Sequence, residues 1–65
     1  MTFMKQLLDE IERNIKLLEE YKKIGFPGQI GATLIKMNIE TAKKSIEEDN
    51  LPEMLLIFEK LKKNK

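Results

Sequence analysis

The sequence predicts an all-α protein built from one long N-terminal helix and a helical hairpin. Apolar residues recur at spacings of three and four along most of the 65 residues, and Leu, Ile and Met supply most of the 42% hydrophobic content. All three glycines and one of the two prolines fall between Gly25 and Thr33, where they separate the first helix from the rest. Residues 1–65 are short enough to form a single domain.

The first helix is expected over about residues 2–24, with Thr2 as its N-cap. Two apolar residues, Leu17 and Ile24, lie off its main stripe. The stripe itself consists of Met4, Leu7, Leu8, Ile11, Ile15, Leu18 and Tyr21. We expect Gly25 to end this helix in the left-handed conformation, with Phe26 folding back on the last turn and Pro27 preventing the helix from continuing.

The second helix is expected over about residues 30–48, with its start lying between Gly28 and Thr33. Its main apolar face consists of Ile35, Ile39, Ala42 and Ile46, whereas Ile30, Leu34 and Met37 project to a different side. The first half of this helix is therefore apolar on two faces.

The third helix is expected over about residues 51–62, with Asn50 as its cap and Glu53 three residues later. Five consecutive apolar residues run from Met54 to Phe58, so they surround the helix for more than one turn and predict burial on every side. Two partner helices cannot enclose such a helix, which predicts a homo-oligomeric bundle. The expected interface is Ile30, Leu34, Met37, Leu55, Leu56 and Phe58, and the terminal Lys60, Lys62, Lys63 and Lys65 are expected to fray.

The composition argues against several classes of function. The net charge of +1 does not favour DNA binding, and no segment has the apolar run of a signal peptide or a membrane span, so a cytoplasmic protein is expected. The chain has no histidine and no cysteine, which removes the usual zinc ligands and the commonest catalytic groups. We therefore expect no catalytic residues, no metal and no cofactor, and the protein is not expected to be an enzyme.

The glycine-rich stretch offers one candidate site. Small residues at the start of a helix let an anion such as a phosphate approach the unpaired backbone N–H groups and the positive end of the helix dipole. The expected ligand-binding residues are Tyr21, Lys22, Phe26, Gly28, Gly31, Ala32, Thr33 and Lys36. The structural alternative is a tight turn between helices, in which the glycines serve capping and close packing.

The order of a leading helix, a Gly/Pro-rich turn opening into Gly31-Ala32-Thr33-Leu34-Ile35, and a short hairpin containing Met54-Leu55 and Leu61-Lys62 resembles small phage-encoded helical proteins. Some of these are homo-oligomeric nucleotide sponges of the anti-CBASS and anti-Thoeris groups. The resemblance implies sequestration of a cyclic nucleotide between subunits in the host cell cytoplasm, without catalysis, with phosphates near Gly28 to Thr33. The alternative function is a small protein-interaction module or inhibitor that covers a host protein with its apolar helix faces.

Overall fold

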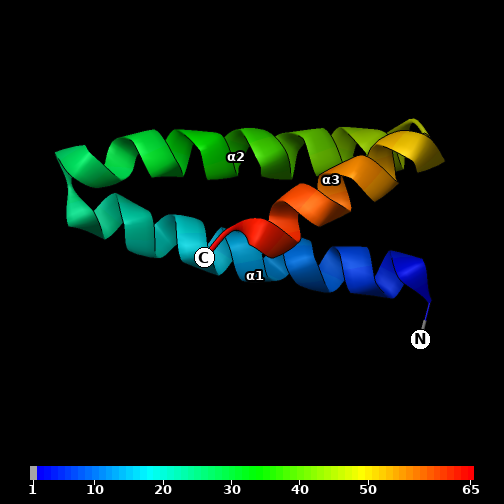
Figure 1. Cartoon of the computed structure of the whole chain (residues 1–65), viewed down its shortest axis with the longest axis horizontal. Coiled ribbons are helices and arrows are strands. Elements are labelled where there is room, and N and C mark those ends of the chain that lie inside the picture. The colour runs from blue at the N-terminus through cyan, green and yellow to red at the C-terminus, as the bar shows by residue number, and fades with distance from the viewer. Residues whose placement is uncertain (1) are drawn as a thin grey trace.

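The computed structural model describes residues 2–65, apart from the side chain of Pro27, and its regular secondary structure over that range is all helical. Three helices follow one another along the chain: α1 (Phe3–Ile24), α2 (Phe26–Glu47) and α3 (Leu51–Lys63). The antiparallel α1 and α2 have 22 residues each, whereas α3 has 13 and crosses obliquely over one face of the pair (Figure 1). The predicted all-α fold is confirmed.

Helix α1 buries a narrower face than its apolar stripe suggests. Its N-cap is Thr2, as predicted, because the Thr2 hydroxyl accepts a hydrogen bond from the backbone N–H of Lys5 at 3.2 Å. Leu7 and Ile11 are buried, and Leu17, which lies off the stripe, packs partly buried against the core. The stripe residues left at least one third exposed are Met4, Leu8 and Ile15.

Gly25 alone separates α1 from α2. Its φ of 90° requires a glycine, but its ψ of −147° differs from the predicted left-handed helical cap. Helix α2 begins at Phe26 instead of near residue 30, because Pro27 occupies the first turn, where its missing N–H breaks no helical bond. The first helix ends at Ile24 as predicted, but the prediction that Pro27 keeps the chain from re-entering a helix is wrong. Phe26 does not fold back on α1 either, since it is the first residue of α2 and is 78% exposed.

One core joins the three helices. The predicted main face of α2 is confirmed, because Ile35, Ile39 and Ala42 are buried and Ile46 packs partly buried against them. The core cluster consists of Leu7, Ile11, Ile35, Ile39, Ala42, Met54, Ile57 and Leu61. The second apolar side of α2 stays outside this core: Ile30, Leu34 and Met37 are all exposed.

The turn between α2 and α3 ends α2 in a Schellman arrangement. Asp49 has a positive φ of 53°, the Asn50 N–H donates to the Ser45 carbonyl at 2.9 Å, and the Asp49 N–H donates to the Ile46 carbonyl at 3.1 Å. The Asn50 side chain then accepts a hydrogen bond from the Glu53 N–H at 3.2 Å, which confirms Asn50 as the cap of α3. One short turn thus closes one helix and starts the next.

Helix α3 is not buried all round within one chain, in keeping with the expectation that two partner helices cannot enclose it, and burial of its remaining side by a second copy stays a prediction. Met54, Ile57 and Leu61 face the core, whereas Leu55 is 50% exposed and Leu56 is 63% exposed. The reason is that α1 and α2 both contact the same side of α3.

The Phe58 ring makes its contacts within its own chain. It is half-buried, and its ring meets the Phe3 ring edge-on with 5.2 Å between the ring centroids. The Lys62 ammonium lies 5.2 Å from the centre of the same ring. Phe58 therefore packs partly within its own chain, and its expected place at an interface between copies stays a prediction.

A buried asparagine fixes the end of α3 on α1. Asn14 is fully buried, and its amide nitrogen donates to the carbonyls of Glu10 at 2.8 Å and Leu61 at 3.2 Å. The Asn14 side-chain oxygen accepts from the amide nitrogen of Asn64 at 2.9 Å. A buried amide with all these groups paired holds the end of α3 in one position.

Arg13, the one arginine of the chain, completes this contact. Its two terminal nitrogens donate to the carbonyls of Asn64 at 2.9 Å and Leu61 at 2.7 Å, and its Nε pairs with the Glu10 carboxylate at 2.8 Å. Helix α3 thus continues to Lys63, one residue beyond its expected end, and Asn64 is held by Arg13 and Asn14, whereas fraying of the lysine-rich end stays a prediction. We call the contacts of Arg13 and Asn14 with residues 61–64 the α3 clamp.

The clamp predicts a large cost for Asn14→Leu. This change keeps a similar volume but leaves the Asn64 amide without its partner and removes one of the donors to the Leu61 carbonyl, which keeps its bond from Arg13, so we expect a loss of about 1–2 kcal/mol in the free energy of unfolding. Urea unfolding followed by circular dichroism measures it. The control is Gln6→Leu, an exposed position on the same helix, with an expected change within about 0.5 kcal/mol. Equal effects of the two changes would contradict the clamp.

Candidate functional site

Two glycines of the candidate site, Gly28 and Gly31, allow α2 to pack closely against α1. A Cβ at Gly28 would lie 2.2 Å from the Tyr21 carbonyl oxygen and 3.0 Å from the Ile24 Cβ. A Cβ at Gly31 would lie 2.5 Å and 2.6 Å from two carbons of the Tyr21 ring. On the side that faces α1, the space beside both glycines is therefore filled by the protein itself.

The start of α2 lies earlier in the chain than the phosphate hypothesis requires. Because the helix begins at Phe26, Gly31 and the two residues after it lie beyond the first turn, where backbone N–H groups are the donors of the helix itself. The Thr33 hydroxyl donates to the Gln29 carbonyl at 2.9 Å, and Ala32 is buried. The geometry thus favours the packing interpretation for this stretch.

Four of the eight expected ligand residues nevertheless meet in one hollow between α1 and α2. This hollow has a volume of about 240 Å³, and we call it the lysine hollow. It is lined by Leu18, Lys22, Gln29, Ala32, Thr33 and Lys36. Within the described part of the chain neither lysine forms an ion pair, so two ammonium groups border a mostly apolar floor.

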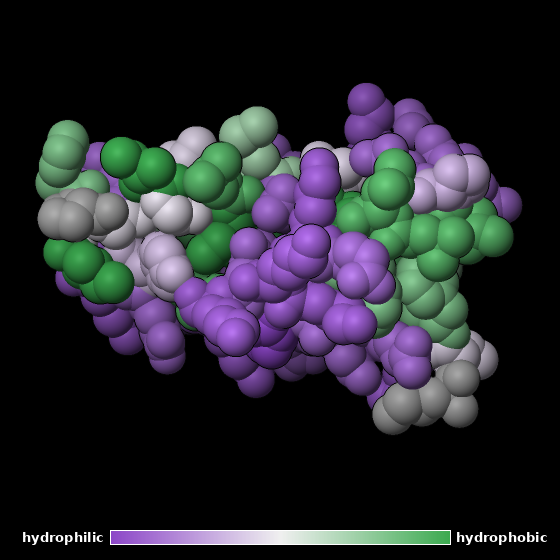
Figure 2. Space-filling model, viewed as in Figure 1, coloured by the Kyte–Doolittle hydropathy of each residue, from purple (hydrophilic) through white to green (hydrophobic). Residues whose placement is uncertain are grey.

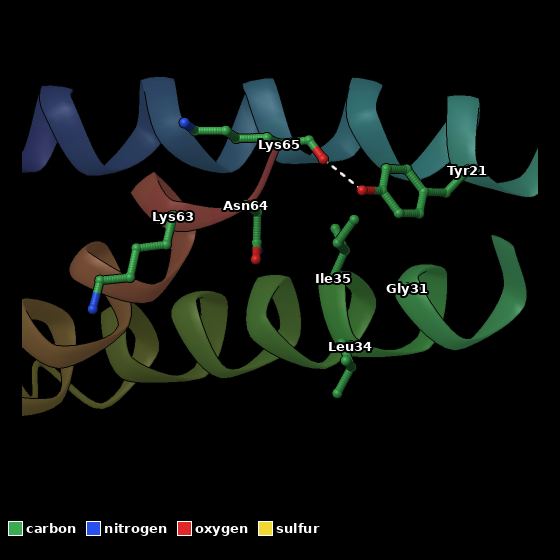
Figure 3. A pocket seen from close by; sticks show the side chains of 7 residues that line it. All are labelled: Tyr21, Gly31, Leu34, Ile35, Lys63, Asn64 and Lys65. Carbon is green, nitrogen blue, oxygen red and sulfur yellow. Dashed lines mark hydrogen bonds between the residues drawn. The ribbon is translucent and has the colours of Figure 1, made fainter.

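Two further expected residues, Tyr21 and Gly31, line a different hollow of about 360 Å³ near the end of the chain. Figure 3 shows the Tyr21 ring beside Gly31, with the Tyr21 hydroxyl donating to the carbonyl of Lys65. The Lys63 and Lys65 side chains point away from Tyr21 in this view. The full lining is Tyr21, Gly31, Leu34, Ile35, Lys63, Asn64 and Lys65. The expected site is thus split, since Phe26 and Gly28 line neither hollow.

The two most exposed large apolar side chains of the described residues, Phe26 and Ile30, lie on α2 together with two further exposed ones. Phe26, Ile30, Leu34 and Met37 are 78%, 70%, 58% and 57% exposed, and their spacing of four, four and three residues puts them on one side of the helix. We call these four residues the α2 stripe. They stay uncovered because they lie on the side of α2 that faces away from the core residues Ile35, Ile39 and Ala42, whereas α1 and α3 pack on the core side (Figure 1).

The expected interface between copies is divided by this arrangement. Figure 2 shows one hydrophobic region towards the end where α1 meets α2, and another towards the end where α2 meets α3, with hydrophilic atoms between them. Ile30, Leu34 and Met37 belong to the α2 stripe, whereas Leu55 and Leu56 lie on α3.

The α3 clamp is the feature that sequence reasoning missed. The available signal was Asn14, a polar residue at position i+3 from Ile11 and i−4 from Leu18, within an otherwise apolar stripe. In the part of the chain that the structure describes, no three acidic, His or Cys side chains lie close enough to hold a metal ion. No helix in that part has the length and apolarity needed to cross a membrane.

Comparison of the sequence with protein-family models gives no match, and neither curated proteins nor solved structures provide a similar chain. The resemblance to phage-encoded sponge proteins therefore stays a prediction.

The glycine contacts predict a difference between Gly28→Ala and Gly31→Ala. The first would push a methyl group into backbone atoms of α1, so we expect a loss of about 2–3 kcal/mol in stability. The second meets only a side-chain ring, which can rotate, so a loss of about 1 kcal/mol or less is expected. Thermal and urea unfolding of both variants measure the difference. A harmless Gly28→Ala would show that the two helices do not approach so closely.

Proposed function

We propose that this chain is a non-enzymatic binding protein, a small helical module that recognises another protein surface through the α2 stripe. The observation that supports this most strongly is the exposure of four large apolar side chains on one side of one helix, over about 17 Å. Helices that dock into protein grooves use anchors at this spacing. Soluble monomers rarely leave such a contiguous apolar surface uncovered.

The composition supports a role without catalysis. The chain has no His and no Cys, so an acid, base or nucleophile would have to come from weaker candidates. Among these, the Ser45 hydroxyl is buried and donates to the Ala42 carbonyl at 2.7 Å. The Tyr21 hydroxyl donates a hydrogen bond to the Lys65 carbonyl. The exposed apolar side chains of the α2 stripe are suited to binding another protein surface.

Site-specific photo-crosslinking tests this proposal. A photoreactive phenylalanine analogue placed at Leu34 should give covalent products in cells that express the chain, since this position lies within the binding surface. The same analogue at Lys43, an exposed position on the charged side of α2, is the matched control. Products at Lys43 that equal those at Leu34 in kind and amount would refute the α2 stripe as the binding surface.

A second candidate function is the sequestration of a cyclic nucleotide, as the sequence resemblance implies. It is supported by the lysine hollow, where Lys22 and Lys36 come from different helices and border the same apolar floor. An ammonium group attracts phosphate as a point charge, and an apolar floor suits the face of a base. At about 240 Å³ the hollow is smaller than usual pockets for a whole ligand, so a second chain would have to complete the site.

Calorimetric titration with cyclic dinucleotides, cyclic trinucleotides and cyclic ADP-ribose isomers tests this candidate. If one ligand binds, Lys22→Ala and Lys36→Ala should each weaken it by about tenfold, because each removes a charge-assisted contact. The control variant, Lys43→Ala, lies on the same helix as Lys36 but outside the hollow and should bind normally. Absence of heat with every ligand removes this candidate and leaves the first one standing.

A further inference from the structure

We infer that the protein surface recognised by the α2 stripe is the same stripe on a second copy of this chain. This inference rests on the proposed function and names its partner. In the pair, two α2 helices lie antiparallel about a twofold axis near Leu34. Ile30 of one copy then faces Met37 of the other, and Phe26 faces Thr41.

The accessible surface of the chain is large enough to accommodate a second copy on the α2 stripe. The accessible surface is 4789 Å², whereas a compact monomer of 7.6 kDa exposes about 4,300 Å². At roughly 150–200 Å² for a large apolar residue, the exposed fractions of the α2 stripe leave on the order of 450 Å² per copy. Two copies would bury about 900 Å² together, which is in the range of small, weak interfaces.

The charges around the stripe favour an identical partner over a charged one. From Phe26 to Thr41 the only charged residues are Glu40 and Lys36, and Lys36 borders the lysine hollow. A charged partner would find no complementary group on the stripe, whereas an identical stripe brings no like charges into contact. The net charge of +1 adds little repulsion between copies.

The other exposed apolar residues are less suited to self-association. On α1, Leu8 and Ile15 lie beside the exposed ion pairs of Lys5 with Asp9 and of Glu12 with Lys16. On α3, Leu55 and Leu56 are followed by the pair of Glu59 and Lys62. Charged groups would have to lose water at either surface, which costs more than covering the neutral stripe.

The first test is sedimentation equilibrium of the full chain with two matched variants, each of which replaces an exposed leucine of a helix. We expect the wild type to form dimers. Leu34→Glu should weaken dimerisation at least tenfold, because two carboxylates would meet near the axis. Leu56→Glu, on α3, should leave the dimer unchanged. Circular dichroism checks that both variants are folded.

The second test uses the absence of cysteine in the native sequence. Leu34→Cys should form a disulfide-linked dimer under mild oxidation, since the twofold axis brings the two sulfur atoms together, whereas Leu56→Cys should stay largely monomeric. A wild type that stays monomeric at a chain concentration of about 100 μM would overturn the inference. So would loss of dimerisation in Leu56→Glu but not in Leu34→Glu. If the wild type is monomeric while crosslinking at Leu34 captures a different protein, this inference fails and the proposed function stands.

Discussion

The arrangement of the three helices depends on which groups donate hydrogen bonds to the last carbonyls of α3. The last carbonyls of a helix have no partner within it, and a glycine cap or water usually supplies one. Here α1 supplies it, through the fork of Arg13 and the buried amide of Asn14. Because these side chains fit only one position of the Leu61 carbonyl, they set where α3 lies along α1. A 13-residue helix with a lysine-rich end would otherwise have few contacts that define its register.

The clamp also determines which part of the α1–α2 pair carries no third helix. It holds the end of α3 near the middle of α1, so the half of the α1–α2 pair nearest Gly25 receives no third helix (Figure 1). That half is held by a different device, the close approach of α2 to α1 at Gly28 and Gly31. Stability at this end comes from contact between two helices, which buries one side of α2 and leaves the α2 stripe on another.

Regular patterns predicted the helices well, and tertiary contacts account for what they missed. The period of Ile35, Ile39 and Ala42 identified the core face of α2, and the caps at Thr2 and Asn50 followed from local chemistry. The start of α2 was placed too late because proline was read as a stop, although it is equally suited to a first turn.

The candidate site was less accessible to sequence reasoning, because its geometry depends on pairs of residues far apart in the chain. Whether a glycine is open to a ligand depends on what lies opposite, and for Gly31 this is the ring of Tyr21 from another helix. The convergence of Lys22 and Lys36 on one hollow likewise follows from the packing of α1 against α2. The α3 clamp joins residues about fifty positions apart, and no local pattern reports such a contact.

The one-residue connection at Gly25 has a consequence for how the chain tolerates changes in length. Each residue added to a helix turns everything after it by about 100°. An insertion at Gly25 would therefore rotate α2 against α1, taking Gly28 away from the backbone it approaches and bringing part of the α2 stripe inward. The three-residue turn at 48–50 can absorb such an addition with less effect on the helices. Length variation in proteins of this architecture should accordingly concentrate at the second turn and avoid the first.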